Sequence, residues 1–308
     1  MADKFLRKAR RREFSPVGWA LLIYWGIMNL VVAVFVVIDA FRSGSDDGTQ
    51  SGGWGYILTC AIGLLLILIW KGRHFYSREI FARGKPMKTG SFFTLLSLLM
   101  ACQLVFKFLL VWQEILMNNW GGSMINMMEN SAIDTDNLSM FLYAGIVAPV
   151  VEELIFRGLI LRCLLPRGKK LAILGSAFLF AMFHGNYAQA PFAFAAGVVF
   201  AYAAVEYSIL WAMVLHMFNN LILSDALTRL FSGLPDGGSV LITLIILGFS
   251  IAALVLMIRK RREIAGSWKQ DPMDREAAFC FFTSPGVVTI TVVLWLNMGL
   301  TVLSGLIY

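Results

Sequence analysis

The second half of the sequence places polar side chains that could do chemistry inside strongly apolar segments. An ionisable side chain in the middle of a membrane is costly, so it needs either a partner or a function. The candidate site residues that meet this description are Glu152, Glu153, Arg157, His184, His216 and Asn220. They come from neighbouring segments and lie at similar estimated depths, which favours one shared cavity over several separate structural contacts.

Helical spacing divides these residues into two kinds. Glu153 and Arg157 stand four positions apart, so they share one helix face and can form an ion pair. Glu152 points about 100° away from Glu153 and need not take part in that pair. His216 and Asn220 are also four positions apart, which places an imidazole and a carboxamide on one face of a later helix. Either pair by itself could be purely structural.

A carboxylate outside the ion pair, together with a histidine, can activate a water molecule. Glu152 in a low-dielectric site is suited to general-base work near neutral pH. A second histidine and an asparagine can donate hydrogen bonds to the oxyanion that forms on a carbonyl group. The combination predicts amide hydrolysis without a covalent intermediate. No serine or cysteine is placed as a nucleophile, because Cys163 lies at the far end of its segment.

A metal site is the alternative within the same set of residues. Glu152, His184 and His216 could form a site with two histidines and one carboxylate. However, the helical H-E-x-x-H pattern is absent, and the carboxylates come first, on another segment. We therefore expect a metal-free reaction without a cofactor, and we expect these three residues to be the ligands if a metal takes part.

The composition requires lipid as the solvent for most of this chain. Of its 308 residues, 58% are hydrophobic and only 15% are charged, and the mean hydropathy is +0.73. A soluble domain has roughly 45–50% apolar and about 25% charged residues. The net charge of +7 could suggest nucleic acid as a partner. We reject that interpretation because the positive residues lie in short blocks between apolar segments, and we expect membrane lipid as the surrounding partner.

The apolar segments predict an all-α, polytopic transmembrane helical bundle with eight or nine spans. A span needs about 20 apolar residues, or fewer inside a packed bundle. The first segment is too long for a signal peptide and has no cleavage site. The predicted spans are 17–38, 54–70, 91–112, 139–161, 171–187, 190–205, 209–223, 239–258 and 286–307.

Charge predicts the orientation of the bundle, because loops rich in lysine and arginine stay in the cytoplasm. Most of the 26 cationic residues lie in four blocks, at 4–12, 71–88, 162–170 and 259–275. With nine spans these blocks all fall on one side of the membrane, whereas the loops of the other side carry mostly acidic residues. We therefore expect a cytoplasmic N-terminus and an external C-terminus.

The candidate residues also carry a resemblance to a known family. Glu152–Arg157 reads EELIFR, residues 180–184 read FAMFH, and residues 216–220 read HMFNN. In this order the three motifs resemble the CAAX protease and bacteriocin-processing membrane peptidases, also called the Abi or type II CAAX endopeptidase family. The resemblance covers about residues 139–223. It suggests a catalytic core at 139–223, flanked by N-terminal helices at 1–138 and C-terminal helices at 224–308.

The resemblance implies a role for each candidate residue. Glu152 and His184 would activate the water, and Glu153 with Arg157 would support Glu152 and the architecture of the site. His216 and Asn220 would form the oxyanion hole, in a cavity that opens towards the cytoplasmic leaflet of the cell membrane. The expected substrate is a membrane-associated peptide or a lipidated protein, because relatives act on prenylated proteins, bacteriocin precursors and other membrane peptides.

Two other classes of function stay open in the sequence. A non-catalytic scaffold or regulator, for example an immunity protein or a partner of a sensor kinase, would use the buried polar residues only for packing. A transporter would also carry charges inside the membrane, but the sequence shows no inverted repeat of the kind transporters have. The intact motifs favour the peptidase.

Overall fold

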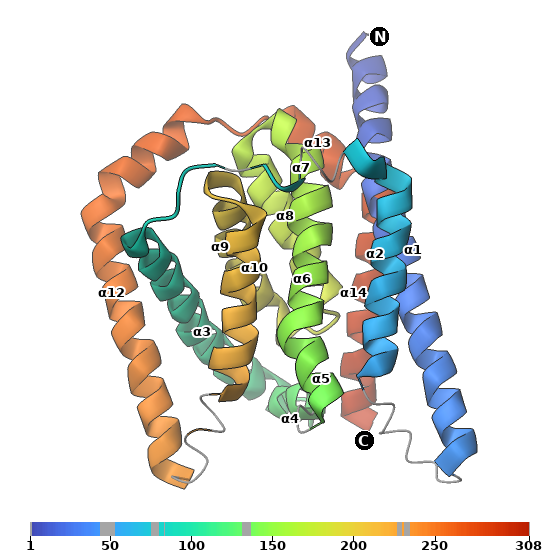
Figure 1. The fold of residues 1–308 in the computed structure, drawn as a ribbon, viewed down its shortest axis with the longest axis vertical. Helices are drawn as coiled ribbons and strands as arrows, with labels where there is room; N and C mark the ends of the chain where they lie inside the picture. The colour runs from blue at the N-terminus through green and yellow to red at the C-terminus, as the bar shows by residue number, and fades with distance from the viewer. Residues whose placement is uncertain are drawn as a thin grey trace.

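The computed structural model describes residues 2–43, 53–74, 80–82, 84–130, 137–226, 230 and 235–307. In these ranges the chain contains helices, turns and short connections, and no strand. The predicted all-α class is therefore confirmed for the described chain. Figure 1 shows long helices that run roughly side by side between two ends of the molecule.

The helices extend further than the predicted spans at several places. The first part of the chain forms α1 (Ala2–Ser43), α2 (Trp54–His74), α3 (Thr89–Asn118) and α4 (Met124–Asn130). The middle part forms α5 (Leu138–Leu142), α6 (Ala148–Glu153), α7 (Leu161–Leu164), α8 (Lys169–Phe183), α9 (Ala190–Glu206) and α10 (Ile209–Phe218). The last part forms α12 (Pro235–Gln270), α13 (Arg275–Phe282) and α14 (Pro285–Ile307).

Five helical stretches are long and apolar enough to cross a membrane, among the described residues. They are Lys4–Ile38, Thr89–Asn118, Leu138–Arg167, Gly238–Gln270 and Pro285–Leu303, and the shorter apolar helices are Trp54–Leu66, Ala190–Glu206 and Ile209–Ile222. Every predicted span falls on a helix. The predicted end of the fifth span at residue 187 is wrong, because the helix ends at Phe183 and Gly185 follows with a positive φ of 66°.

The middle helices form the centre of the bundle and the terminal helices surround them. Helix α8 packs along α9, and α10 packs against α9 and α6. Helix α1 packs against α2 and α14 on one side of this centre, and α12 packs against α3 on the other side (Figure 1). The core is therefore continuous from the outer helices to the helices that carry the candidate site residues.

At one end of the bundle, charged side chains from distant segments form ion pairs. Arg167 pairs with Glu13 at 2.7 Å, and Glu206 accepts hydrogen bonds from both Lys85 and Lys169. At the same end α1 begins, whereas α14 ends at the opposite end (Figure 1). This arrangement brings basic residues from distant parts of the sequence to one end of the bundle. The side of the membrane on which this end lies stays a prediction.

Candidate active site

The helix that carries the two glutamates is interrupted by wider turns on both sides of them. Residues Leu138–Arg167 form one continuous helical rod, in which α6 lies between the π-helical segments Tyr143–Val147 and Leu154–Ile160. Such segments are rare and occur frequently at functional sites, because they change which side chains share a helix face. Here they set the direction in which Glu152 and Glu153 leave the rod.

Arg157 and Glu153 form the buried ion pair that their spacing predicts. Both side chains are completely buried, and Arg157 Nη1 donates to Glu153 Oε1 at 2.7 Å. Arg157 Nη2 donates to the carbonyl oxygen of Gly197 on α9 at 3.0 Å, which joins the two helices. A charged group without water needs partners of this kind, because removing it from water costs several kcal/mol. The pair is therefore a fixed part of the bundle.

The second partner of Glu153 is His216. His216 Nδ1 lies 2.9 Å from Glu153 Oε1, and His216 Nε2 lies 3.6 Å from Glu152 Oε2. Because the paired Glu153 is an acceptor, Nδ1 carries the hydrogen and donates it. Glu153 therefore positions His216, which faces Glu152 with its other nitrogen. The supporting role expected for Glu153 and Arg157 stays a prediction.

Phe180, one helical turn before His184, contacts this histidine through both its backbone and its ring. Its carbonyl oxygen lies 2.9 Å from His184 Nδ1. A carbonyl oxygen can only accept, so Nδ1 carries the hydrogen and Nε2 has the free lone pair of the neutral ring. The Phe180 ring packs edge-on against the rings of His184 and His216 and lies 4.3 Å from the Arg157 guanidinium. Phe180 thus orients His184 through its carbonyl oxygen, and its ring contacts His216 and the Arg157 guanidinium.

A cavity of about 300 Å³ brings the chemically capable side chains together. The residues with polar side-chain groups that line it are Tyr143, Glu152, His184, Gln189, His216, Asn219 and Asn220. Its other walls come from α1, α6 with the π-helical segments on both sides of it, α8 and α9, mostly as aromatic and alanine side chains. Glu153 and Arg157 lie behind this surface with no exposure. The candidate residues therefore separate into cavity-facing residues and a buried pair that supports them.

Asn220 lines the cavity, and its side-chain amide forms two hydrogen bonds within the bundle. Its Nδ2 donates to the carbonyl oxygen of Ala144 at 2.9 Å, and its Oδ1 accepts from Asn219 Nδ2 at 3.1 Å. The amide carries two N–H bonds, so one remains for another acceptor. The helix changes to π-helical turns at Asn219, which run to Ala226. Asn220 therefore sits where α10 gives way to a wider helix.

The alternative interpretation of the site is a metal site, which would need a cluster of metal-ligating side chains. In the part of the chain that the structure describes, no group of three or more histidine, cysteine, aspartate or glutamate side chains is arranged to hold a metal ion. Glu152, His184 and His216 share the cavity without forming such a group. The role of a metal is a question for the experiment below.

The comparison with protein families now identifies the segment that builds this cavity. Residues 134–222 match the model of the family described as type II CAAX prenyl endopeptidase Rce1-like. These residues are therefore similar to this family, and we call them the Rce1-like segment. The match contains all three motifs and confirms the resemblance that they predict. No curated protein and no solved structure matches the chain.

Sequence reasoning alone missed several contacts around the Rce1-like segment. The carbonyl of Gly197 and the ring of Phe200, which stacks on His216 with 4.6 Å between ring centroids, complete the site from α9. The only signal for Gly197 was its place in a stretch rich in glycine and alanine, which allows helices to approach closely. Nothing in the sequence indicates Gln103 of α3, which donates to Asn219 from outside the Rce1-like segment.

Gly197→Ala is expected to destabilise the Rce1-like segment by about 1–3 kcal/mol, the usual cost of overpacking. A Cβ atom at this position would lie 3.1 Å from the Phe180 ring, 3.2 Å from Arg157 Nη2 and 3.3 Å from Ala177 Cα. Gly26→Ala is the matched control, because Gly26 is also helical and a Cβ there meets nothing within 4 Å. Melting temperatures in lipid or detergent measure both variants. A Gly197→Ala protein as stable as Gly26→Ala would contradict the close packing.

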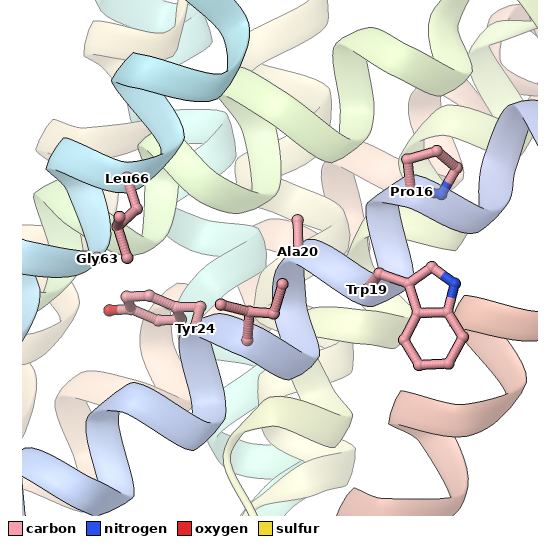
Figure 2. Close-up of a pocket in the computed structure, with 7 residues that line it drawn as sticks. Pro16, Trp19, Ala20, Tyr24, Gly63 and Leu66 are labelled. Atoms are coloured by element: carbon pink, nitrogen blue, oxygen red, sulfur yellow. The ribbon is translucent and has the colours of Figure 1, made fainter.

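A second cavity lies between α1 and α2 and is almost entirely apolar. It has a volume of about 440 Å³ and is lined by Pro16, Trp19, Ala20, Ile23, Tyr24, Gly63 and Leu66. Figure 2 shows Tyr24 of α1 pointing towards Gly63 of α2 at one side of this cavity. The Tyr24 ring also stacks on Phe183, which lines the polar cavity. Of these two stacked side chains, Tyr24 thus lines the apolar cavity and Phe183 the polar one.

Proposed function

We propose that this chain is an intramembrane endopeptidase that hydrolyses a peptide bond by means of a water molecule activated by Glu152 and His184. The observation that carries the proposal is the shared cavity: a carboxylate outside the ion pair and a histidine with a defined lone pair face the same space. The Rce1-like match of residues 134–222 supports a peptidase at the level of the family.

The side chains suggest how the reaction would proceed. Glu152 takes a proton from water, and the oxygen of that water forms a bond with the carbonyl carbon of the substrate. His184 accepts a hydrogen bond from the same water through Nε2. The resulting oxyanion accepts hydrogen bonds from the remaining N–H of Asn220 and from the Nε2 side of His216, whose ring Glu153 positions through Nδ1. The C–N bond then breaks, and the proton held by Glu152 passes to the leaving amine.

For the substrate we propose a membrane-associated peptide or a lipidated protein, with prenylation as the modification that the family description names. The apolar cavity between α1 and α2 supports this choice, because a lipid chain needs an apolar place close to the polar cavity. We further propose that the chain is a multi-pass protein of the cell membrane with a cytoplasmic N-terminus. The basic residues gathered at one end of the bundle support this orientation.

The test is cleavage of a peptide library, with prenylated and unprenylated members, by the purified protein in lipid. Wild-type protein and His184→Ala are compared, each with and without a chelator. The proposal expects cleavage by the wild type that survives the chelator, disappears in His184→Ala and is faster for prenylated peptides.

Each departure from that result has a defined meaning. Cleavage lost with the chelator would replace the metal-free mechanism by a metal site on Glu152, His184 and His216. Equal cleavage rates for prenylated and unprenylated peptides would overturn the proposal that the substrate is lipidated. Absence of cleavage by the wild type would overturn the peptidase and favour the scaffold.

A further inference from the structure

A chain of side-chain amides connects α3 to the active-site cavity. Gln103 Nε2 donates to Asn219 Oδ1 at 3.0 Å. Asn219 Nδ2 donates to Asn220 Oδ1 at 3.1 Å, and Asn220 Nδ2 donates to the carbonyl oxygen of Ala144 at 2.9 Å. Asn219 and Asn220 both line the cavity that holds Glu152. The first member of the chain lies outside the Rce1-like segment, and the last is the backbone of that segment.

The direction of this amide chain is determined by its last member. A backbone carbonyl oxygen can only accept, so Asn220 must turn its NH₂ group towards Ala144. Its oxygen then faces Asn219, which must donate, and the oxygen of Asn219 in turn faces Gln103. A donor at position 103 is therefore the one that this arrangement requires. In this orientation Gln103 donates to Asn219, Asn219 donates to Asn220, and Asn220 donates to Ala144.

We propose that Gln103 is a positioning residue that holds the amide of Asn220 in the orientation needed for oxyanion binding. This inference rests on the proposed function, because it assigns the remaining N–H of Asn220 to the oxyanion. The reasoning is energetic: an amide oxygen in a helix bundle that loses its donor gains from rotating towards another one. Rotation of Asn219 would present the wrong group to Asn220, and Asn220 would in turn lose its fixed donor.

Gln103→Met removes the donor and keeps the length of the side chain. The expected result is a kcat lower by roughly threefold to tenfold, the effect of one interhelical hydrogen bond, with little change in KM. Gln113→Met is the matched control. Gln113 lies on the same helix and donates at 3.4 Å to the carbonyl oxygen of Tyr187, which is not part of the amide chain. It should leave kcat unchanged, and an equal loss in both variants would overturn the inference.

Gln103→Glu gives a readout that a merely structural role would not produce. A neutral carboxylic acid can donate to Asn219 as the amide does, whereas a carboxylate can only accept. The ratio of the variant's kcat to that of the wild type should therefore be near one at low pH and fall as the new carboxyl group ionises. A ratio that does not change with pH would overturn the inference.

A stability cycle tests the amide chain without any activity. Melting temperatures are measured for the wild type, Gln103→Met, Asn220→Ala and the double variant. If the amide chain exists, the double variant lowers the melting temperature by less than the sum of the two single decreases. For Gln113→Met combined with Asn220→Ala, the decreases in melting temperature should add. Additive losses for Gln103 would overturn the inference even if the wild type hydrolyses peptides. Coupled losses in a protein that hydrolyses nothing would keep the chain of amides and overturn both the proposed function and the role of Gln103 in it.

Discussion

Glu152→Gln is expected to lower kcat for peptide hydrolysis by about 10²–10⁴-fold, the usual contribution of a general base. Glutamine has nearly the same shape as glutamate, but its side chain cannot take a proton from water. Glu152 is the cavity-facing carboxylate next to His216, at 3.6 Å from its Nε2, and about a quarter of its side chain is exposed. The loss should therefore appear in the chemical step and not in folding. Single-turnover cleavage in lipid measures it directly.

Two controls separate this effect from a general loss of protein. The melting temperature of Glu152→Gln should stay close to that of the wild type, because Glu152 is outside the Arg157 pair. Glu263→Gln removes an exposed carboxylate on α12 and should change neither stability nor kcat. A Glu152→Gln protein with near wild-type hydrolysis would refute the role of this residue, whatever the other variants show.

Arg157→Ala is expected to have the largest effect on stability, at about 3–5 kcal/mol, because it leaves a buried carboxylate without its charge partner. Both members of the pair have no exposure. The substitution also removes the hydrogen bond to the carbonyl of Gly197 and the contact with the Phe180 ring. The expected observation is a much lower melting temperature together with a low yield of folded protein.

The double variant Glu153→Gln/Arg157→Met tests whether the unpaired carboxylate of Glu153 causes the loss of stability. Removing both charges avoids the unpaired carboxylate, so most of the stability should return. Activity should stay low, because His216 loses the carboxylate on its Nδ1. If Arg157→Ala melts like the wild type, or if the double variant is as unstable as the single one, the buried pair does not hold this bundle together.

The sequence by itself determined the features that depend on neighbours along one helix. The apolar segments required helices in a lipid environment, and every predicted span falls on a helix. The spacing of Glu153 and Arg157 implied an ion pair because residues four apart lie on one helix face. The same rule separated Glu152 from the pair, and the three motifs indicated the family that residues 134–222 match. The division of the chain at residues 138 and 223 and the membrane orientation stay predictions.

Only the tertiary structure decided which partners come from other helices. His216 lies between two glutamates, the carbonyl of Gly197 accepts from Arg157, and Gln103 reaches Asn219 from a helix far away in the sequence. Helical periodicity gives the face on which a side chain lies, but it does not give the neighbour that this face meets. That neighbour depends on how closely the helices pack, and on the π-helical turns that rotate one part of a helix relative to the next.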